Sequence, residues 1–139
     1  MSYNPLRKKN YGIFVPIGRG HFGKVFKSRK DGKDVAIKEI DVGGLDQNEA
    51  NIIKQLDHLN VTKANDIISF KNKIFIVMDL MERTVAKELE LNGKFLEYKA
   101  LVTFIQVANG LRYLHSKSIA HRDLKCDNIL LGKWKNDHA

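Results

Sequence analysis

The chain has 139 residues, of which 43% are hydrophobic and 29% are charged, a composition typical of one globular domain with a solvated surface. The 24 lysine and arginine residues outnumber the 16 acidic ones, for a net charge of +8, but they are scattered without interleaved aromatic residues, which argues against nucleic-acid binding. Apolar runs such as IFIVM are too short to span a bilayer, and the single Cys126 excludes an internal disulfide framework, so we expect a cytoplasmic or nuclear protein with no membrane partner.

The first half of the chain has the pattern of β-strands. The stretches YGIFVPIG and GKVFKSR flank a glycine-rich turn, and KDVAIKEID follows the turn signal Asp31-Gly32. The stretch DQNEANIIKQLDHL has helical spacing, with its isoleucines and first leucine on one face. After this helix we expect two more strands, NDIISF and KIFIVMDL.

The second half changes to a helical pattern. ERTVAKELEL predicts a short helix that ends near Asn92-Gly93. EYKALVTFIQVANGLRYLHSK predicts a helix about 30 Å long, apolar over more than half its circumference, and such a helix needs packing partners all round. Its apolar positions are Leu101, Val102, Phe104, Ile105, Val107, Ala108, Leu111 and Leu114. We therefore expect a strand-rich lobe and then a helical lobe, with a hinge at about residues 79–83.

Three glycines between the first two expected strands suggest a phosphate-binding backbone. Residues 17–25 read IGRGHFGKV, a G-x-G-x-x-G-x-V pattern whose glycines let backbone N–H groups approach phosphate oxygens. A dinucleotide-binding fold has the same glycines but needs the third one to begin a helix. The following KVFKSR is typical of a strand, which disfavours that alternative.

The next expected strand contains VAIK, residues 35–38. Because side chains alternate along a strand, Val35 and Ile37 share one face, and Ala36 and Lys38 share the other. A small residue beside a lysine leaves room for a planar base and directs an ammonium toward phosphates. Glu49, in the following helix, is the candidate ion-pair partner of Lys38; each is also compatible with an ordinary surface position.

The stretch HRDLKCDN, residues 121–128, carries the most specific chemistry. Asp123 can accept a hydroxyl proton, Lys125 can meet a transferring phosphoryl group, and Asn128 can bind a hard cation through its amide oxygen. We expect His121 and Arg122 to hold the loop in place.

These motifs resemble, in order, those of the protein kinase family, over about residues 11–131. Lys125 at its place in the loop is similar to the serine/threonine type. The resemblance implies an α+β, two-lobe fold: an N-terminal extension (1–10), a complete N-lobe (11–80) with a five-stranded antiparallel sheet and one helix, and a hinge with the start of the helical C-lobe (81–139).

The resemblance also implies the roles of individual residues. Asp123 is the expected catalytic base, Lys125 assists at the γ-phosphate, and Asn128 binds one Mg²⁺. Lys38, paired with Glu49, holds the α- and β-phosphates of ATP. The remaining expected ATP contacts are the glycine-rich loop (Gly18, Gly20, Gly23), the residues around adenine (Ile17, Val25, Ala36, Leu130, with Met78 as gatekeeper) and the hinge backbone (Asp79, Met81).

The 139 residues contain no DFG motif, and the Lys38–Glu49 spacing is shorter than is usual in the family. We therefore expect phosphoryl transfer to a protein substrate from a complete form that includes that motif. The alternatives are an inactive nucleotide- or partner-binding module and a nonfunctional truncated product. We further expect a protein partner to cover the long helix, because baring half its apolar side chains forgoes about 6–12 kcal/mol.

Overall fold

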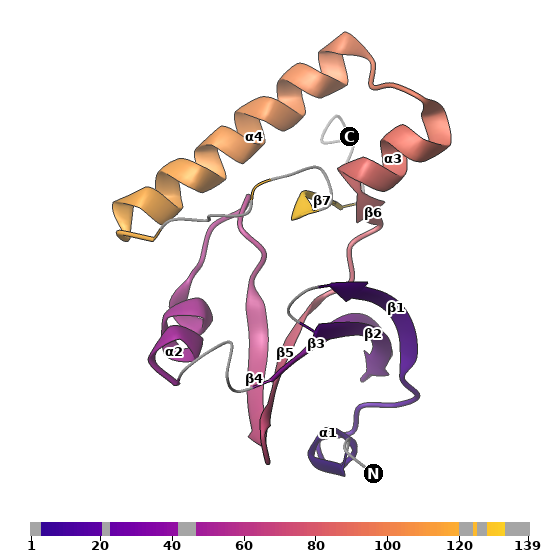
Figure 1. The fold of residues 1–139 in the computed structure, drawn as a ribbon, viewed down its shortest axis with the longest axis vertical. Helices are drawn as coiled ribbons and strands as arrows, with labels where there is room; N and C mark the ends of the chain where they lie inside the picture. Colours follow the sequence, from indigo (N-terminus) through magenta and orange to yellow (C-terminus); the bar gives the residue numbers. More distant parts are fainter. Residues whose placement is uncertain (1–3, 21–22, 42–46, 120–123, 125–127, 133–139) are drawn as a thin grey trace. The chain divides into compact units, whose positions relative to one another are not determined.

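The computed structural model describes residues 4–20, 23–41, 47–119, 124 and 128–132; for Asn4, Arg19, Gly20, Gly23 and residues 47–49 it describes the backbone alone. The chain forms two compact units (Figure 1). Unit 1 comprises Met1–Asp57 and Thr62–Leu80, and unit 2 comprises His58–Val61 and Met81–Ala139. No helix within the described ranges is long and apolar enough to cross a membrane.

Unit 1 is built on a five-stranded sheet whose neighbouring strands are all antiparallel, which confirms the prediction. The spatial order is β1 (Val15–Gly20), β2 (Gly23–Lys30), β3 (Lys33–Asp41), β5 (Lys73–Asp79) and β4 (Ala64–Phe70). The β2–β3 hairpin turns on Asp31 and Gly32, with φ of 53° and 79°. Two positive φ angles suit a two-residue hairpin turn, and both residue types tolerate them.

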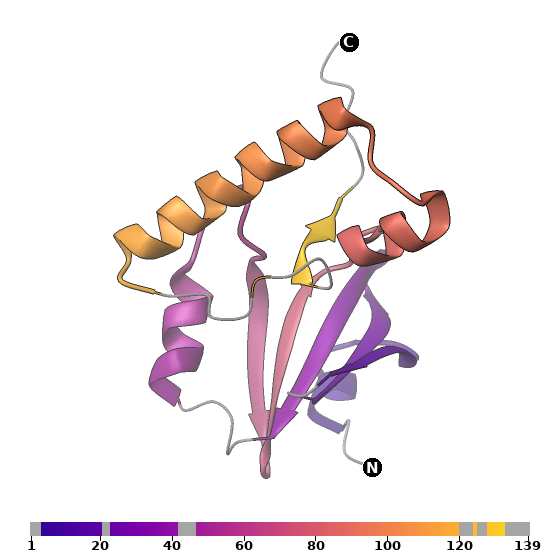
Figure 2. The same ribbon diagram turned by 45° about the horizontal axis from the view of Figure 1, so that its top comes forward.

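Each face of this sheet carries a cluster of buried side chains. One core contains side chains of β3, β4 and β5 together with Leu6 and Tyr11 from the N-terminus: Leu6, Tyr11, Val35, Ile37, Ile68, Phe75 and Val77. The other contains Ile40, Ala64, Ile74 and Ile76, with Ile53 of α2 (Gln47–Gln55) packed against it. In Figure 2 α2 stands beside β4, whereas α1 (Asn4–Lys8) lies behind β2, so a helix covers part of each face.

The helix α2 ends earlier than the sequence pattern predicted, at Gln55, and leaves Leu59 94% exposed. Residues 58–61 instead pack against α4 (Glu97–Ser116) in unit 2. There the His58 ring stacks on Tyr113, with ring centroids 4.9 Å apart, and its Nδ1 accepts a hydrogen bond from the Asn60 N–H at 3.0 Å. The α2 prediction was therefore too long by a few residues, because these contacts compete with continuation of the helix.

Unit 2 also contains the predicted short helix α3 (Val85–Asn92) and a two-stranded ladder of β6 (Arg83–Thr84) and β7 (Leu130–Leu131). Thr84 Oγ1 accepts from the Lys87 N–H at 3.0 Å and caps α3, which ends at Gly93 with φ 77°. Along α4, Gly110 and Leu114 are buried, but Leu101 is 59% and Phe104 70% exposed. Much of the apolar surface of α4, which the sequence pattern predicted to be packed, is therefore exposed.

Polar side chains of three neighbouring strands contact one another at the end of β5. Asp79 Oδ1 accepts from the amide of Asn65 on β4 at 2.8 Å and pairs with Lys33 Nζ on β3 at 3.0 Å. The hydrogen bond from Lys33 makes the largest contribution to lowering the pKa of Asp79 below its ordinary value of 3.8, and the hydrogen bond from Asn65 makes the next largest. We call these three residues the Asp79 clamp.

Substituting Gly110 with alanine should destabilise unit 2, although alanine is the better helix former. A Cβ at this position would lie 2.7 Å from the backbone oxygen of Asn60, so residues 58–61 would have to move. We expect a loss of about 1–3 kcal/mol, the usual cost of overpacking. Hydrogen exchange of the α4 amides measures it, with the exposed neighbour Asn109→Ala as control. Equal protection in the two variants would contradict the packing of residues 58–61 on α4.

The Asp79 clamp should stabilise unit 1 in a pH-dependent way. Because the folded pKa is lowered, the contribution is present above pH 3.8 and is lost as the pH falls through the folded value. The groups are exposed, so we expect about 0.2–1 kcal/mol. Chemical denaturation at pH 7 and at pH 3 should show a smaller difference for Asp79→Asn than for wild type, and Lys33→Met should have a larger effect than Asn65→Ala. An unchanged pH dependence in Asp79→Asn would refute this role.

Candidate nucleotide-binding face

The glycine-rich segment forms the end of the β1–β2 hairpin, where Gly20 pairs with Gly23 and Gly18 lies opposite Val25. Both flanking segments are strands, and no helix begins at the third glycine, which excludes the dinucleotide-binding alternative. A Cβ built on Gly18 would meet no other atom within 4 Å. The packing of the protein itself therefore does not demand glycine here, and the missing side chain leaves the backbone open to a ligand.

The predicted alternation in VAIK is confirmed by the register of β3. Lys38 pairs with Val25 on β2, and Ala36 pairs with Met78 on β5. Directly opposed residues of antiparallel strands point to the same side of the sheet, with Cβ atoms about 4.5–5.5 Å apart. Val25, Ala36, Lys38 and Met78 thus lie on one face of three adjacent strands. We call it the Lys38 face.

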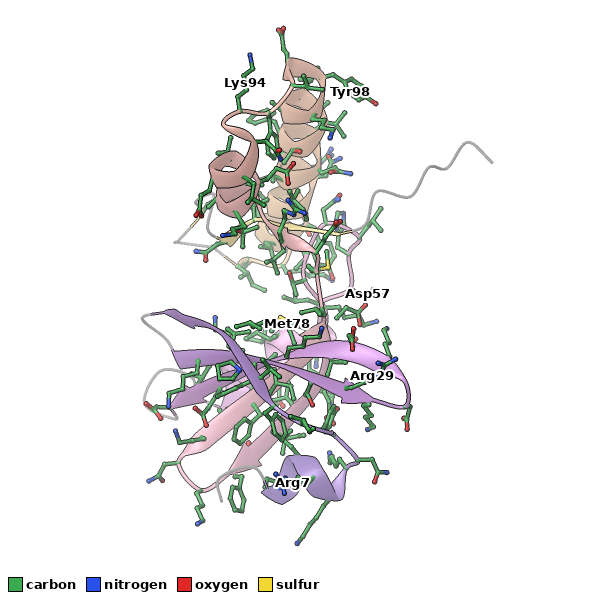
Figure 3. All side chains as sticks on the ribbon, turned by 90° about the vertical axis from the view of Figure 1, so that its right-hand side faces the viewer. Arg7, Arg29, Asp57, Met78, Lys94 and Tyr98 are labelled. Atoms are coloured by element: carbon green, nitrogen blue, oxygen red, sulfur yellow. The ribbon has the colours of Figure 1, made fainter. Side chains whose placement is uncertain are left out.

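The chemistry of this face differs from that of the opposite one. Ala36 is buried, Met78 is packed at the margin of the second core, and Lys38 is half-buried. In Figure 3 Met78 projects from one side of the sheet, and Arg7 of α1 lies beyond the other side. A small side chain beside a thioether gives a flat apolar surface, and the ammonium of Lys38 supplies positive charge next to it.

The predicted partner of Lys38 is only partly described. The backbone of Glu49 belongs to α2, as expected, but its side chain lies outside the described residues. The Lys38–Glu49 ion pair therefore stays a prediction. Ile17 occupies an irregularity in the β1–β2 pairing and is 50% exposed, and Asp79 lies at the end of β5 with its carboxylate held in the clamp.

The other predicted site residues belong to unit 2. Leu130 pairs with Thr84, and the flanking Val85 N–H donates to the Ile129 oxygen at 2.9 Å. Met81 lies at the same ladder, since a Cβ on Gly132 would come within 3.0 Å of its Cε. The structure therefore brings Met81 and Leu130 to one small ladder that follows the hinge.

The HRDLKCDN segment, residues 121–128, lies mostly outside the described residues. Asn128 is exposed and directly precedes the segment leading into β7, whereas Asp123 and Lys125 lie outside the described residues. Within the described ranges no group of three or more histidine, cysteine, aspartate or glutamate side chains could hold a metal ion. The roles of Asp123, Lys125 and Asn128 therefore stay predictions from the sequence.

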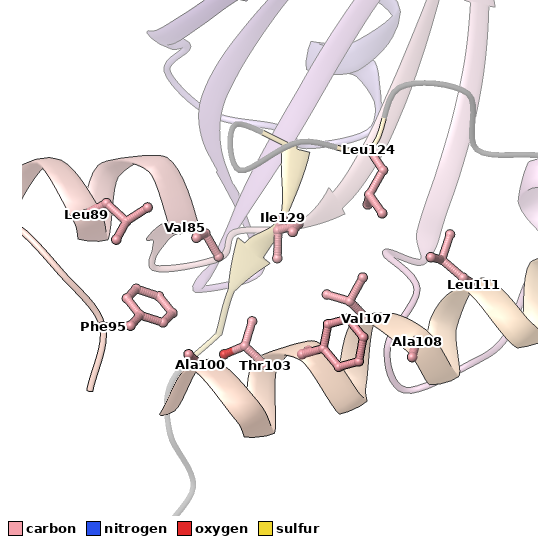
Figure 4. A pocket seen from close by; sticks show the side chains of 11 residues that line it. Val85, Leu89, Phe95, Ala100, Thr103, Val107, Ala108, Leu111, Leu124 and Ile129 are labelled. Atoms are coloured by element: carbon pink, nitrogen blue, oxygen red, sulfur yellow. The ribbon is translucent and has the colours of Figure 1, made fainter. Parts of the chain in front are cut away.

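Unit 2 also has an apolar hollow of about 470 Å³ between α3, α4 and the segment before β7 (Figure 4). Thr103 is its one polar lining residue among those described, so it offers little to the phosphates of a nucleotide. Its lining is Val85, Leu89, Phe95, Ala100, Thr103, Phe104, Val107, Ala108, Leu111, Leu124 and Ile129. This hollow continues the bare apolar surface of α4.

Sequence reasoning missed two groups of residues that support the Lys38 face. Leu6, from the predicted N-terminal extension (1–10), and Tyr11, at the predicted start of the N-lobe, pack on the opposite side of the sheet. Lys33 and Asn65 hold Asp79, and no motif marks them. The turn Asn10-Tyr11 after a short basic stretch was an available signal, because asparagine often ends helices with a positive φ.

Comparison with known proteins agrees with this arrangement. A family model described as the protein kinase domain matches residues 11–137. The chain is 38% identical over 136 residues to serine/threonine-protein kinase kin-29 of Caenorhabditis elegans, covering 91% of this chain and 16% of that protein. It is 37% identical over 138 residues to testis-specific serine/threonine-protein kinase 3 of Mus musculus, covering 91% of this chain and 52% of that protein.

A third relative, the probable serine/threonine-protein kinase MARK-A of Dictyostelium discoideum, is 35% identical over 133 residues, or 88% of this chain and 12% of that protein. The chain thus spans between 12% and 52% of the length of these relatives. The family match covers the Lys38 face, the hinge and the HRDLKCDN loop together. The chain belongs to the protein kinase family, of the eukaryotic serine/threonine type.

Proposed function

We propose that this chain is the ATP-binding part of a protein serine/threonine kinase. In its complete form the kinase transfers the γ-phosphate of ATP to serine or threonine hydroxyls of a protein substrate. The observation that carries the proposal is the Lys38 face, where Val25, Ala36, Lys38 and Met78 come together on adjacent strands beside the glycine hairpin. Family membership supports the same reading.

Adenine is the part of ATP that suits the apolar end of this face. Ala36 is short enough to leave space for a planar ring, and Val25 and Met78 border it on the neighbouring strands. The ammonium of Lys38 would pair with phosphate oxygens, while the open backbone at Gly18 would let N–H groups approach them. We propose that Ile17 and Leu130 complete the apolar contacts and that Asp79 and Met81 bond the base through their backbones.

The proposed reaction needs one proton acceptor and little other covalent chemistry. The substrate hydroxyl oxygen forms a bond to the γ-phosphorus, the bond from that phosphorus to the β,γ-bridging oxygen breaks, and the hydroxyl proton passes to the Asp123 carboxylate. Lys125 would neutralise charge on the transferring group. Asn128 would hold a Mg²⁺ ion, which supplies further charge neutralisation when bound. ADP and the phosphorylated protein leave.

We also propose that the bare apolar surface of α4 binds a protein partner. Phe104 and Leu101 are more than half exposed, and the hollow beside Phe104 and Val107 continues the same surface. Burying each such side chain contributes about 1.5–3 kcal/mol. Capture of a defined partner by wild type and its loss in Phe104→Glu would support this role. A wild-type protein that stays monodisperse and binds none of the cell's proteins would contradict it.

Nucleotide binding should depend on Lys38 and on the small size of Ala36. We expect Lys38→Met to raise the Kd for ATP about tenfold or more, because a charge-assisted hydrogen bond contributes about 1.5–3 kcal/mol. Ala36→Leu should abolish binding by filling the space for the base. Calorimetric titration measures both. Lys24→Met is the matched control, since Lys24 is an exposed lysine on β2 that pairs with Glu39, so it points to the other side of the sheet. Equal affinities of the two methionine variants would contradict the proposed site.

Phosphoryl transfer by the whole protein should depend on Asp123. Removing a positioned general base typically costs about 10²–10⁴ in rate, so Asp123→Asn should lower kcat by that factor while the Kd for ATP stays within about twofold of wild type. Radiolabelled phosphate transfer to a protein substrate measures this. Lys38-dependent ATP binding without any transfer would favour the alternative, an inactive nucleotide- or partner-binding module.

A further inference from the structure

The N-terminal residues 4–12 form a hook that consists of α1 and the turn after it. The Tyr11 N–H donates to the Leu6 oxygen at 3.1 Å, the Asn10 N–H donates to the Arg7 oxygen at 3.0 Å, and Asn10 has φ 69°. This pair of bonds around a left-handed residue is a Schellman cap, which reverses the chain at a helix end and brings the flanking apolar residues together. The five-residue helix is thus ended by a specific local structure.

The hook is fastened to strands on both sides of β3. Towards β2, the Gly12 N–H donates to the Arg29 oxygen at 2.8 Å, and Lys30 Nζ lies 4.8 Å from the centre of the Tyr11 ring. Towards β4, Lys9 Nζ lies 3.3 Å from Asp66 Oδ2. Because the strand order is β1-β2-β3-β5-β4, the hook spans β3 and β5.

The hook also contributes two side chains to the hydrophobic core under β3 and β5. Leu6 is 0% and Tyr11 5% exposed, and both belong to one cluster with Val35 and Ile37 of β3. Val35 and Ile37 alternate along β3 with Ala36 and Lys38, which point to the other face. Close-packed interiors transmit displacement, so a change under Val35 and Ile37 moves the backbone that carries Ala36 and Lys38.

We propose that the hook, residues 4–12, positions β3 and thereby sets the nucleotide affinity of the Lys38 face. The inference rests on the proposed ATP binding for its ligand but on the packing of unit 1 for its mechanism. Leu6, Asn10 and Tyr11 are positioning residues that act through Val35 and Ile37. Figure 3 illustrates the separation: Arg7 marks the hook on one side of the sheet, and Met78 marks the nucleotide-binding side.

Asn10 offers the cleanest test, because it is exposed and its contribution is its backbone conformation. Asn10→Val disfavours the positive φ, whereas the matched control Asn10→Gly allows it. In the full chain we expect Asn10→Val to raise the Kd for ATP about two- to tenfold and Asn10→Gly to leave it unchanged. Leu6→Ala should raise the Kd similarly, and the volume-conserving Leu6→Met should restore it.

Ile68→Ala is the control that distinguishes a specific effect on β3 from a general loss of stability. It opens a cavity in the same core at β4, two strands from β3. The Kd is measured by calorimetry below the unfolding range of every variant, so a purely structural role leaves it unchanged. If the Kd of Asn10→Val equals that of Asn10→Gly, or if Ile68→Ala raises the Kd as much as Leu6→Ala, the proposal is wrong.

Hydrogen exchange tests the same coupling without any nucleotide. In Asn10→Val the amides of residues 35–38 should exchange at least about threefold faster than in Asn10→Gly, because a weakened support lowers local protection, whereas the amides of α4 should not change. Unchanged protection of residues 35–38 overturns the proposal even where no ATP binding is measured. Absent ATP binding in wild type, together with faster exchange, would instead refute the proposed function and leave the positioning role supported.

Discussion

The central strand β3 is packed on both of its faces, and the proposed nucleotide-binding face depends on this constraint. Val35 and Ile37 face the core that includes the hook, while Ala36 and Ile40 face the side on which α2 packs. A slip of one residue in register would exchange these two sets and place Lys38 in an apolar core. Because burial of an unpaired ammonium is strongly unfavourable in free energy, the shifted register of β3 is disfavoured.

The two faces of the sheet are packed by different sets of side chains. Leu6, Tyr11 and Phe75 are large buried side chains on the hook side. On the other side, α2 packs near Ile40 and Ile74, whereas the part around Ala36 and Gly18 carries small residues. An apolar area without large side chains, next to one lysine, favours a flat ligand with a negatively charged end. Small residues at Ala36 and Gly18 contribute little packing to the sheet, and they leave the space that the proposed nucleotide would occupy.

The sequence predicted those features whose patterns are long or chemically specific. The 20-residue α4 repeats the helical period over several turns, whereas VAIK and the glycine hairpin are recognised by their specific residue types. The five-residue α1 is shorter than two helical turns, and β6 and β7 have two residues each, so none of them shows a period. Beyond the end of α2 at Gln55, His58 stacks on Tyr113, a residue far along the chain that no local pattern could indicate. The Asp79 clamp likewise joins Lys33 and Asn65 through tertiary structure alone.

The two units differ in how completely their apolar side chains are packed. The Lys38 face is supported within unit 1 by buried side chains on both sides of β3. In unit 2, the packing of residues 58–61 on Gly110 and Tyr113 anchors one part of α4, but Phe104 and Leu101 stay bare. Anything that binds this apolar surface stabilises the folded helical unit by mass action. Occupancy of that surface would therefore favour the folded form of unit 2, whereas the packing of the Lys38 face lies within unit 1.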